Sequence, residues 1–156
     1  MNKDKYLLTL AGFITWGAVA YVEFGRLADS PFLWPSVVGY SIFLLLFLLI
    51  GCGYADKIPL RNTQIILSTQ LGIALLLMLV HAGQISPVLL VVWAAQLPDY
   101  FSRRTAVLQV IISNLIFYWI QLSLWHFSNA VINSLIYLGF QLFALSTSFA
   151  RVSEPT

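Results

Sequence analysis

Charged side chains are scarce in this 156-residue chain. It carries 8 Lys and Arg, 6 Asp and Glu and 2 His, so that only 9% of its residues are charged. A soluble domain has about 25% charged and about 45–50% apolar residues, whereas 60% of this chain is hydrophobic and its mean hydropathy is +0.86. The composition therefore excludes an ordinary water-soluble domain. The net charge of +2 is accounted for by basic residues gathered on one side of the apolar runs, and we expect no nucleic-acid binding.

Cysteine and the motifs of catalysis are also rare or missing. Cys52 is the only cysteine, which excludes an intramolecular disulfide, and we expect it to be a plain buried thiol. The sequence contains no HExxH, GxSxG, CxxC or P-loop pattern. We therefore predict no metal site, no cofactor and no catalytic activity for this chain alone.

Long apolar runs take the place of charge. A membrane-spanning helix needs about 20 mainly apolar residues, and six runs approach or reach this length. They are residues 6–22, 35–54, 64–82, 85–101, 106–125 and 130–149. We therefore predict a single all-α domain over residues 1–156 with six transmembrane helices in the lipid bilayer, and residues 150–156 as the start of a cytoplasmic linker.

The fourth run has the shortest uninterrupted apolar stretch. This stretch lies between Pro87 and Pro98 and is about 15 Å long as a helix, about half the thickness of the hydrocarbon layer. A helix over residues 85–101 is long enough to cross with local thinning, and Pro98 would then kink its last turn. A re-entrant segment would move the following arginine pair to the other side. The charge pattern therefore favours a full span.

The basic residues predict an orientation. All except Arg26 fall on one side of the six-run pattern: Lys3, Lys5, Lys57, Arg61, Arg103, Arg104 and Arg151. Because short loops rich in Lys and Arg stay in the cytoplasm, both termini are predicted to be cytoplasmic. The longest loop on the opposite side, residues 23–34, is too short for a ligand-binding domain. No charged residue lies in the middle of a run, which argues against an ion-coupled transporter.

Polar side chains follow one face of each of the last two runs. They are Asn114, Tyr118 and Gln121 in the fifth run, and Asn133, Tyr137 and Gln141 in the sixth. Side-chain amides in hydrocarbon need partners, and the simplest partner for each stripe is the other one, across an antiparallel helix pair. Such bonds average only about 0.6 kcal/mol. The contact between the two polar stripes is either packing in a static bundle or a contact that shifts when the bundle responds to a signal.

Two histidines, His81 and His126, close the third and fifth runs at the predicted outer surface. Metal or haem ligation would need further ligands nearby, and the available carboxylates, Glu23 and Asp29, belong to a different loop. The histidines are either ordinary interfacial residues or sensors of outside pH or of a ligand. Sensing of pH is the simplest such role, because an exposed imidazole has a pKa of about 6.5.

Two short stretches carry a resemblance to a known family. One is Ala95-Gln96-Leu97-Pro98 with Arg103-Arg104 after it, and the other is Phe140-Gln141-Leu142-Phe143-Ala144-Leu145 running into residues 148–154. Together with the six-run layout and a last helix that enters the cytoplasm directly, they resemble the membrane input module of bacterial sensor histidine kinases with a HisKA_3-type dimerisation domain.

The resemblance implies a homodimer in the bacterial inner membrane. Its last helix would relay a membrane or small-ligand stimulus to a kinase domain in cis, beyond Thr156. In that scheme the polar residues of the sixth run bias two packings of similar energy, and Lys3, Lys5 and Pro98 respond to bilayer thickness. Two alternatives stay open. One is a stand-alone transport or channel subunit lined by Gln70, Gln96, Gln109, Gln121 and Gln141, and the other is a membrane assembly factor.

Overall fold

The computed structural model describes residues 3–80, 87–125 and 129–153, and all regular structure in these ranges is helical. The helices are α1 (Lys3–Arg26), α2 (Leu33–Gly51), α3 (Leu60–Val80), α4 (Val88–Ala94), α5 (Arg103–Ile120) and α6 (Ala130–Ser153). Short helical turns add η1 (Tyr54–Lys57), η2 (Leu97–Asp99) and the π-helical η3 (Gln121–Trp125). The prediction of an all-α fold is confirmed for the described residues.

Five of the helices, all except α4, are long and apolar enough to cross a membrane. They correspond to the first, second, third, fifth and sixth predicted runs, with ends displaced by a few residues. Large apolar side chains cover their outer surfaces; Leu45, Leu115 and Phe143, for example, are 59%, 63% and 73% exposed. Helices that satisfy their own backbone hydrogen bonds and present such surfaces suit hydrocarbon. The chain therefore has the structure of a multipass helical membrane protein.

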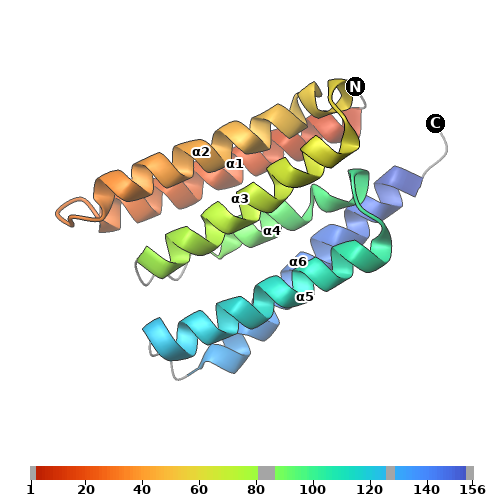
Figure 1. Cartoon of the computed structure of the whole chain (residues 1–156). Helices are drawn as coiled ribbons and strands as arrows, with labels where there is room; N and C mark the ends of the chain where they lie inside the picture. Colours follow the sequence, from red (N-terminus) through yellow and green to blue (C-terminus); the bar gives the residue numbers. More distant parts are fainter. Residues whose placement is uncertain (1–2, 81–86, 126–128, 154–156) are drawn as a thin grey trace.

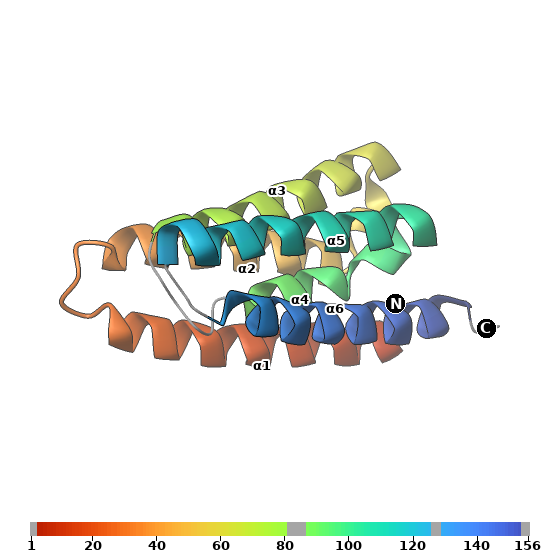
Figure 2. The ribbon, with the colours of Figure 1, turned by 90° about the horizontal axis from the view of Figure 1, so that it is seen from below.

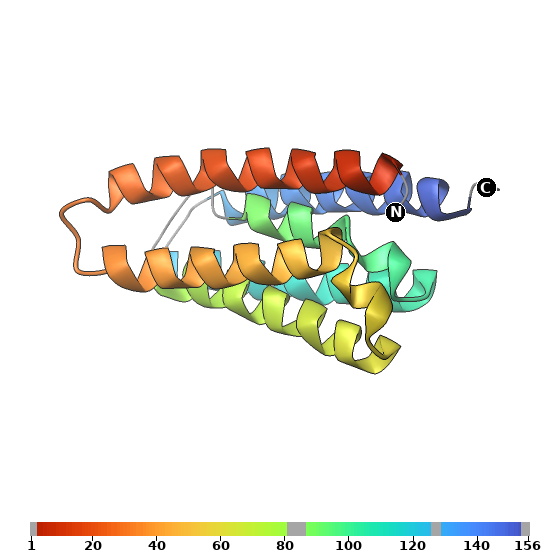
Figure 3. The same cartoon turned by 90° about the horizontal axis from the view of Figure 1, so that it is seen from above.

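The long helices run side by side, and α4 lies among them (Figure 1). Helices α1, α2 and α3 form one half of the bundle, and α5 and α6 form the other. Turned by 90°, the bundle shows α4 between α1 on one side and α3 on the other (Figure 2). Both termini lie at one end, together with η1 and η2, and the 27–32 turn lies at the opposite end (Figure 3).

The fourth segment differs from the predicted helix over residues 85–101, of which 85 and 86 lie outside the described residues. Helix α4 ends at Ala94, and the chain turns through Ala95 and Gln96 into η2. Pro98 lies in η2 and has no N–H to continue a helical ladder. The backbone N–H of Gln96 bonds to the Trp93 carbonyl oxygen instead, at 3.0 Å. The predicted kink is thus a complete interruption, and α4 rises only about 10 Å, too little to cross a membrane by itself.

Burial explains why so short a helix is stable here. Leu89, Leu90, Trp93 and Ala94 of α4 and Leu97 of η2 are all fully buried. A helix that is apolar on every side suits a position surrounded by other helices. The uninterrupted apolar stretch of the fourth run is therefore explained by protein contacts rather than by lipid contacts.

The turns at the two ends of α2 also differ from expectation. Helix α1 continues to Arg26, so the predicted 23–34 loop shrinks to residues 27–32, where the Phe32 N–H donates to Ser30 Oγ at 3.1 Å. At the other end, Gly53 turns the chain with a φ of 90°, which favours glycine. Cys52 is exposed in this turn, so the prediction of a buried thiol is wrong. Helix α2 ends at Gly51, and Cys52 follows it outside the packed face of the helix.

The segment expected to be a linker is partly helical. Helix α6 continues through residue 151 to Ser153 without a break, and residues 154–156 lie outside the described residues.

Candidate functional site

A buried cluster of amide and hydroxyl side chains joins α4, α5 and α6. Asn114 Nδ2 donates to Gln141 Oε1 across the α5–α6 pair, and also to the Val110 carbonyl oxygen at 3.0 Å. Gln141 Nε2 donates to Ser113 Oγ and to the Leu90 carbonyl oxygen of α4, both at 3.4 Å. Asn114 is 6% exposed and Gln141 is fully buried. The side chain of Gln141 therefore bonds to groups on both neighbouring helices.

A second contact of the same kind lies towards the opposite end of the α5–α6 pair from the termini. Gln121 Nε2 donates to Ser134 Oγ at 2.8 Å and to the Ala130 carbonyl oxygen at 3.4 Å. Gln121 is fully buried and begins the π-helical turn η3. We call Ser113, Asn114, Gln121, Ser134 and Gln141 the α5–α6 seam.

Three of the six residues singled out from the stripes lie outside this seam. Asn133 Nδ2 donates to Asn129 Oδ1, in the turn just before α6, at 3.5 Å. The Tyr137 ring packs edge-on against Phe117, with ring centroids 5.6 Å apart. Tyr118 is half-buried and lines a groove on the outer surface of the α5–α6 pair.

Helix geometry accounts for the residues that the stripes missed. A spacing of four residues drifts by about 40° around a helix at each step, so Asn133 lies about 80° away from Gln141. A spacing of seven drifts by only about 20°, and Ser134 therefore shares the face of Gln141. Counting by seven would have found Ser134 in the sequence.

A second polar network connects α4 to the other half of the bundle. Gln70 Nε2 of α3 donates to Gln96 Oε1 at 3.1 Å, and Gln96 Nε2 donates to the Phe47 carbonyl oxygen of α2 at 3.3 Å. Trp93 Nε1 donates to the Leu67 carbonyl oxygen of α3 at 3.0 Å. We call Gln70, Trp93 and Gln96 the α3–α4 network. Through it and the seam, α4 is hydrogen-bonded to both halves of the bundle.

The five glutamines of the channel alternative do not share one surface. Gln70, Gln96, Gln121 and Gln141 are buried and divided between the seam and the α3–α4 network, whereas Gln109 is half-buried and belongs to neither.

Both networks contain unpaired acceptors. Within the described part of the chain, Gln70 Oε1, Asn114 Oδ1 and Gln121 Oε1 are buried without a hydrogen-bond partner. The hydroxyls of Ser36 and Tyr40 on α2 are in the same condition. An unpaired buried acceptor costs about 1–3 kcal/mol, and an apolar environment gives it no substitute. The arrangement is therefore not the best hydrogen bonding that these side chains can make.

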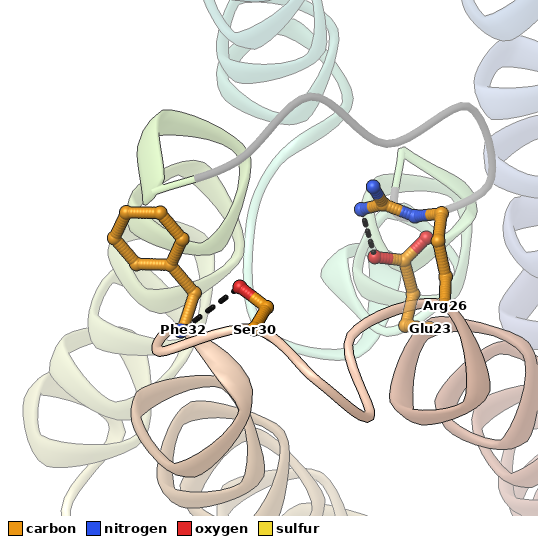
Figure 4. A network of polar contacts seen from close by, with 4 residues as sticks. All are labelled: Glu23, Arg26, Ser30 and Phe32. Carbon is orange, nitrogen blue, oxygen red and sulfur yellow. Dashed lines mark hydrogen bonds and ion pairs between the residues drawn. The ribbon is translucent and has the colours of Figure 1, made fainter.

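A buried carboxylate lies in the last turn of α1, beside the 27–32 turn (Figure 4). The Glu23 side chain is 1% exposed, and its Oε2 accepts from Arg26 Nη2 at 3.0 Å. Sequence reasoning placed Glu23 in a loop, but it follows Val19 and Ala20 on the buried face of α1 by four and three residues. That spacing was the signal available. A carboxylate thus lies inside a helix of spanning length, close to its C-terminal end.

Other predicted residues have no described side-chain environment. His81 and His126 lie outside the described residues. Lys3 and Lys5 belong to the first turn of α1, but their side chains also lie outside the described part. Among the side chains that are described, no three His, Cys, Asp or Glu residues are placed to hold a metal ion.

Comparison with known proteins adds no relative: no protein-family model, no curated protein and no solved structure matches this chain.

Proposed function

We propose that this chain is the membrane-embedded sensor module of a bacterial two-component histidine kinase. It would pass a membrane or small-ligand stimulus through α6 to a cytoplasmic kinase domain beyond Thr156. The observation that carries the proposal is the double attachment of α4. This short buried helix is hydrogen-bonded to α3 through Trp93 and to α6 through Gln141, and Gln96 in the turn that follows it bonds to α2 and α3.

The mechanism needs two packings of similar energy. Unpaired oxygens on Gln70 and Asn114 support this requirement, because Gln70 bonds to Gln96 and the partner of Asn114, Gln141, bonds to Leu90, so that a small shift of α4 would exchange which acceptors are paired. Interhelical hydrogen bonds of this type contribute only about 0.6 kcal/mol each. A stimulus that changes helix tilt by a modest free energy would therefore bias the seam, and α6 would carry the change to its cytoplasmic end.

In the proposed orientation both termini lie on the cytoplasmic side of the inner membrane. Both ends of the chain lie at one end of the bundle (Figure 1). Lys57 of η1, Arg61 in the first turn of α3, and Arg103 and Arg104 in the first turn of α5 belong to the same end. The positive-inside rule assigns such an end to the cytoplasm. In this arrangement α4 and η2 together make the fourth crossing.

The proposed homodimer would use the outer face of α6. Of the five helices of spanning length, α6 has the smallest buried share, 17%. Ile132, Leu135 and Phe143 are exposed on it, and each is large and apolar. A second copy of α6 packed there would bring the two output helices together, as a dimeric kinase requires.

The first test is the size of the native product. The chromosomal gene would be tagged at its N-terminus and membranes would be blotted. A band well above 17.5 kDa, with kinase activity in the immunoprecipitate, is the expected result. A band near 17.5 kDa with no associated kinase activity would contradict a kinase domain in cis.

The burial of Glu23 gives the transport alternative an observation of its own. Carboxylates inside membrane proteins often mark ion pathways. If the chain is a transport subunit, reconstituted vesicles will show a cation or proton flux that Glu23→Gln abolishes. Vesicles without flux would leave the sensor proposal as the better account.

A further inference from the structure

A groove runs between the start of α5 and the end of α6, at the same end of the bundle as the termini. Its volume is about 420 Å³, within the usual range for a small-molecule site. Val107, Leu142, Leu145 and Phe149 supply its apolar walls, and Arg103 and Ser146 lie among them. Leu145 is 3% exposed, whereas Leu142 and Ser146 are exposed, so the groove opens sideways from the bundle.

Arg103 brings a positive charge to the lining of this groove, and no carboxylate in the described part of the chain pairs with it. The Arg103 guanidinium lies 5.2 Å from the centre of the Phe149 ring, and Arg104 follows it on the exposed surface. The first turn of α5 contains no acidic residue, and in the described part of the chain neither arginine pairs with a carboxylate. Two cations at a helix N-terminus oppose the helix dipole. An anion at this position would relieve the repulsion.

We propose that the groove binds an anionic phospholipid of the cytoplasmic leaflet. The phosphate would be held by Arg103 and Arg104, and one acyl chain would follow the apolar walls from Phe149 towards Leu142. Apolar walls that open towards the membrane suit a lipid rather than a soluble phosphate. Basic pockets between transmembrane helices are a known means of binding anionic headgroups. The site depends on the proposed orientation but not on a kinase, so lipid binding and kinase output can fail separately.

The test measures lipid binding directly. The chain would be purified in detergent and titrated with dioleoyl phosphatidylglycerol or dioleoyl phosphatidylcholine, and bound lipid would be counted by native mass spectrometry. We expect tighter binding of phosphatidylglycerol. Arg103→Gln and Arg104→Gln should each weaken that binding about fivefold, the effect of about 1 kcal/mol per basic residue near a lipid surface. Phosphatidylcholine binding should not change.

Two matched controls separate the groove from general surface charge and bulk. Lys57→Gln removes the same charge at the same end of the bundle but lies outside the groove, and should leave phosphatidylglycerol binding unchanged. Ser146→Trp fills the groove and should abolish selective binding, whereas Thr147→Trp, on the neighbouring exposed position outside the lining, should not. Gel filtration would establish that each variant folds.

Three outcomes would overturn the proposal. They are equal binding of the two lipids, an equal loss with Lys57→Gln, and retained selectivity in Ser146→Trp. Displacement of phosphatidylglycerol by millimolar inorganic phosphate would assign the site to a soluble anion instead.

Discussion

Single side chains decide how helices α5 and α6 are joined. The sequence predicts two polar stripes that face each other. In the structure Asn114 and Gln141 bond to each other, whereas Asn133 bonds to Asn129 and not to α5. The residue types were predictable because amides are rare and costly in apolar helices. The partners were not, because a spacing of four drifts around the helix and because the Leu90 carbonyl belongs to α4, a short buried helix whose place beside α6 no spacing rule predicts.

Replacing Asn114 or Gln141 with Leu should destabilise the bundle. Each change removes one partner of a buried pair, and we expect a loss of about 1–2 kcal/mol in the free energy of unfolding, larger for Gln141 because it also bonds to α4. Reversible unfolding in detergent micelles would measure it, with the double variant used to extract the coupling energy.

Asn133→Leu is the matched control, because Asn133 lies outside the seam. Its effect should stay within about 0.5 kcal/mol. A loss as large as that of Asn114→Leu would mean that any amide on these helices matters equally, and the seam would lose its special role.

Among the elements, α4 is the one that hydropathy could not place. The five long helices were predictable because length and apolar composition are sufficient for a span. An apolar run surrounded by protein looks the same in the sequence as one surrounded by lipid, and only the flanking Pro87 and Pro98 hinted at a short helix. A second hint was that Gln70 and Gln96 are amides in neighbouring apolar runs and need partners. In the structure they bond to each other.

Trp93 should therefore be the most important side chain of α4. It is fully buried, and its indole N–H donates to α3. Trp93→Ala should cost about 3–5 kcal/mol, and Trp93→Phe should cost less, because most of the packing volume remains. The same unfolding measurement applies, with Trp119→Ala as control, since Trp119 is 55% exposed. Equal losses at Trp93 and Trp119 would show that α4 is not held by burial.

The contact between α1 and α2 depends on close approach. A Cβ placed at Gly12 would meet the Phe47 ring, whereas one placed at Gly17 on the same helix would meet nothing within 4 Å. Gly12→Leu should therefore destabilise the protein by about 1–3 kcal/mol, and Gly17→Leu should not. Thermal unfolding of the two variants side by side would measure this, and equal melting temperatures would contradict the close approach of these two helices at Gly12.

For the whole molecule, the decisive question is which end of the bundle faces the cytoplasm. The chain provides its own probe, because Cys52 is its only cysteine and is exposed directly after α2, beside η1 at the end that holds both termini. If that end is cytoplasmic, a membrane-impermeant maleimide will not label Cys52 in intact cells but will label it in inside-out vesicles. A permeant maleimide should label it in both. This prediction follows from the distribution of Lys and Arg. Because Cys52 is exposed, it can be tested without introducing a new cysteine.

The reciprocal variant completes the argument. Cys52→Ser combined with Asp29→Cys moves the thiol to the exposed 27–32 turn at the opposite end, where the impermeant reagent should reach it in intact cells. Labelling of Cys52 from outside would invert the orientation. It would also place Arg103 and Arg104 in the outer leaflet and remove the cytoplasmic route from α6 to a kinase. The sensor proposal and the lipid site would then lose their common premise, whereas the packing of α4 between the two halves of the bundle would stand unchanged.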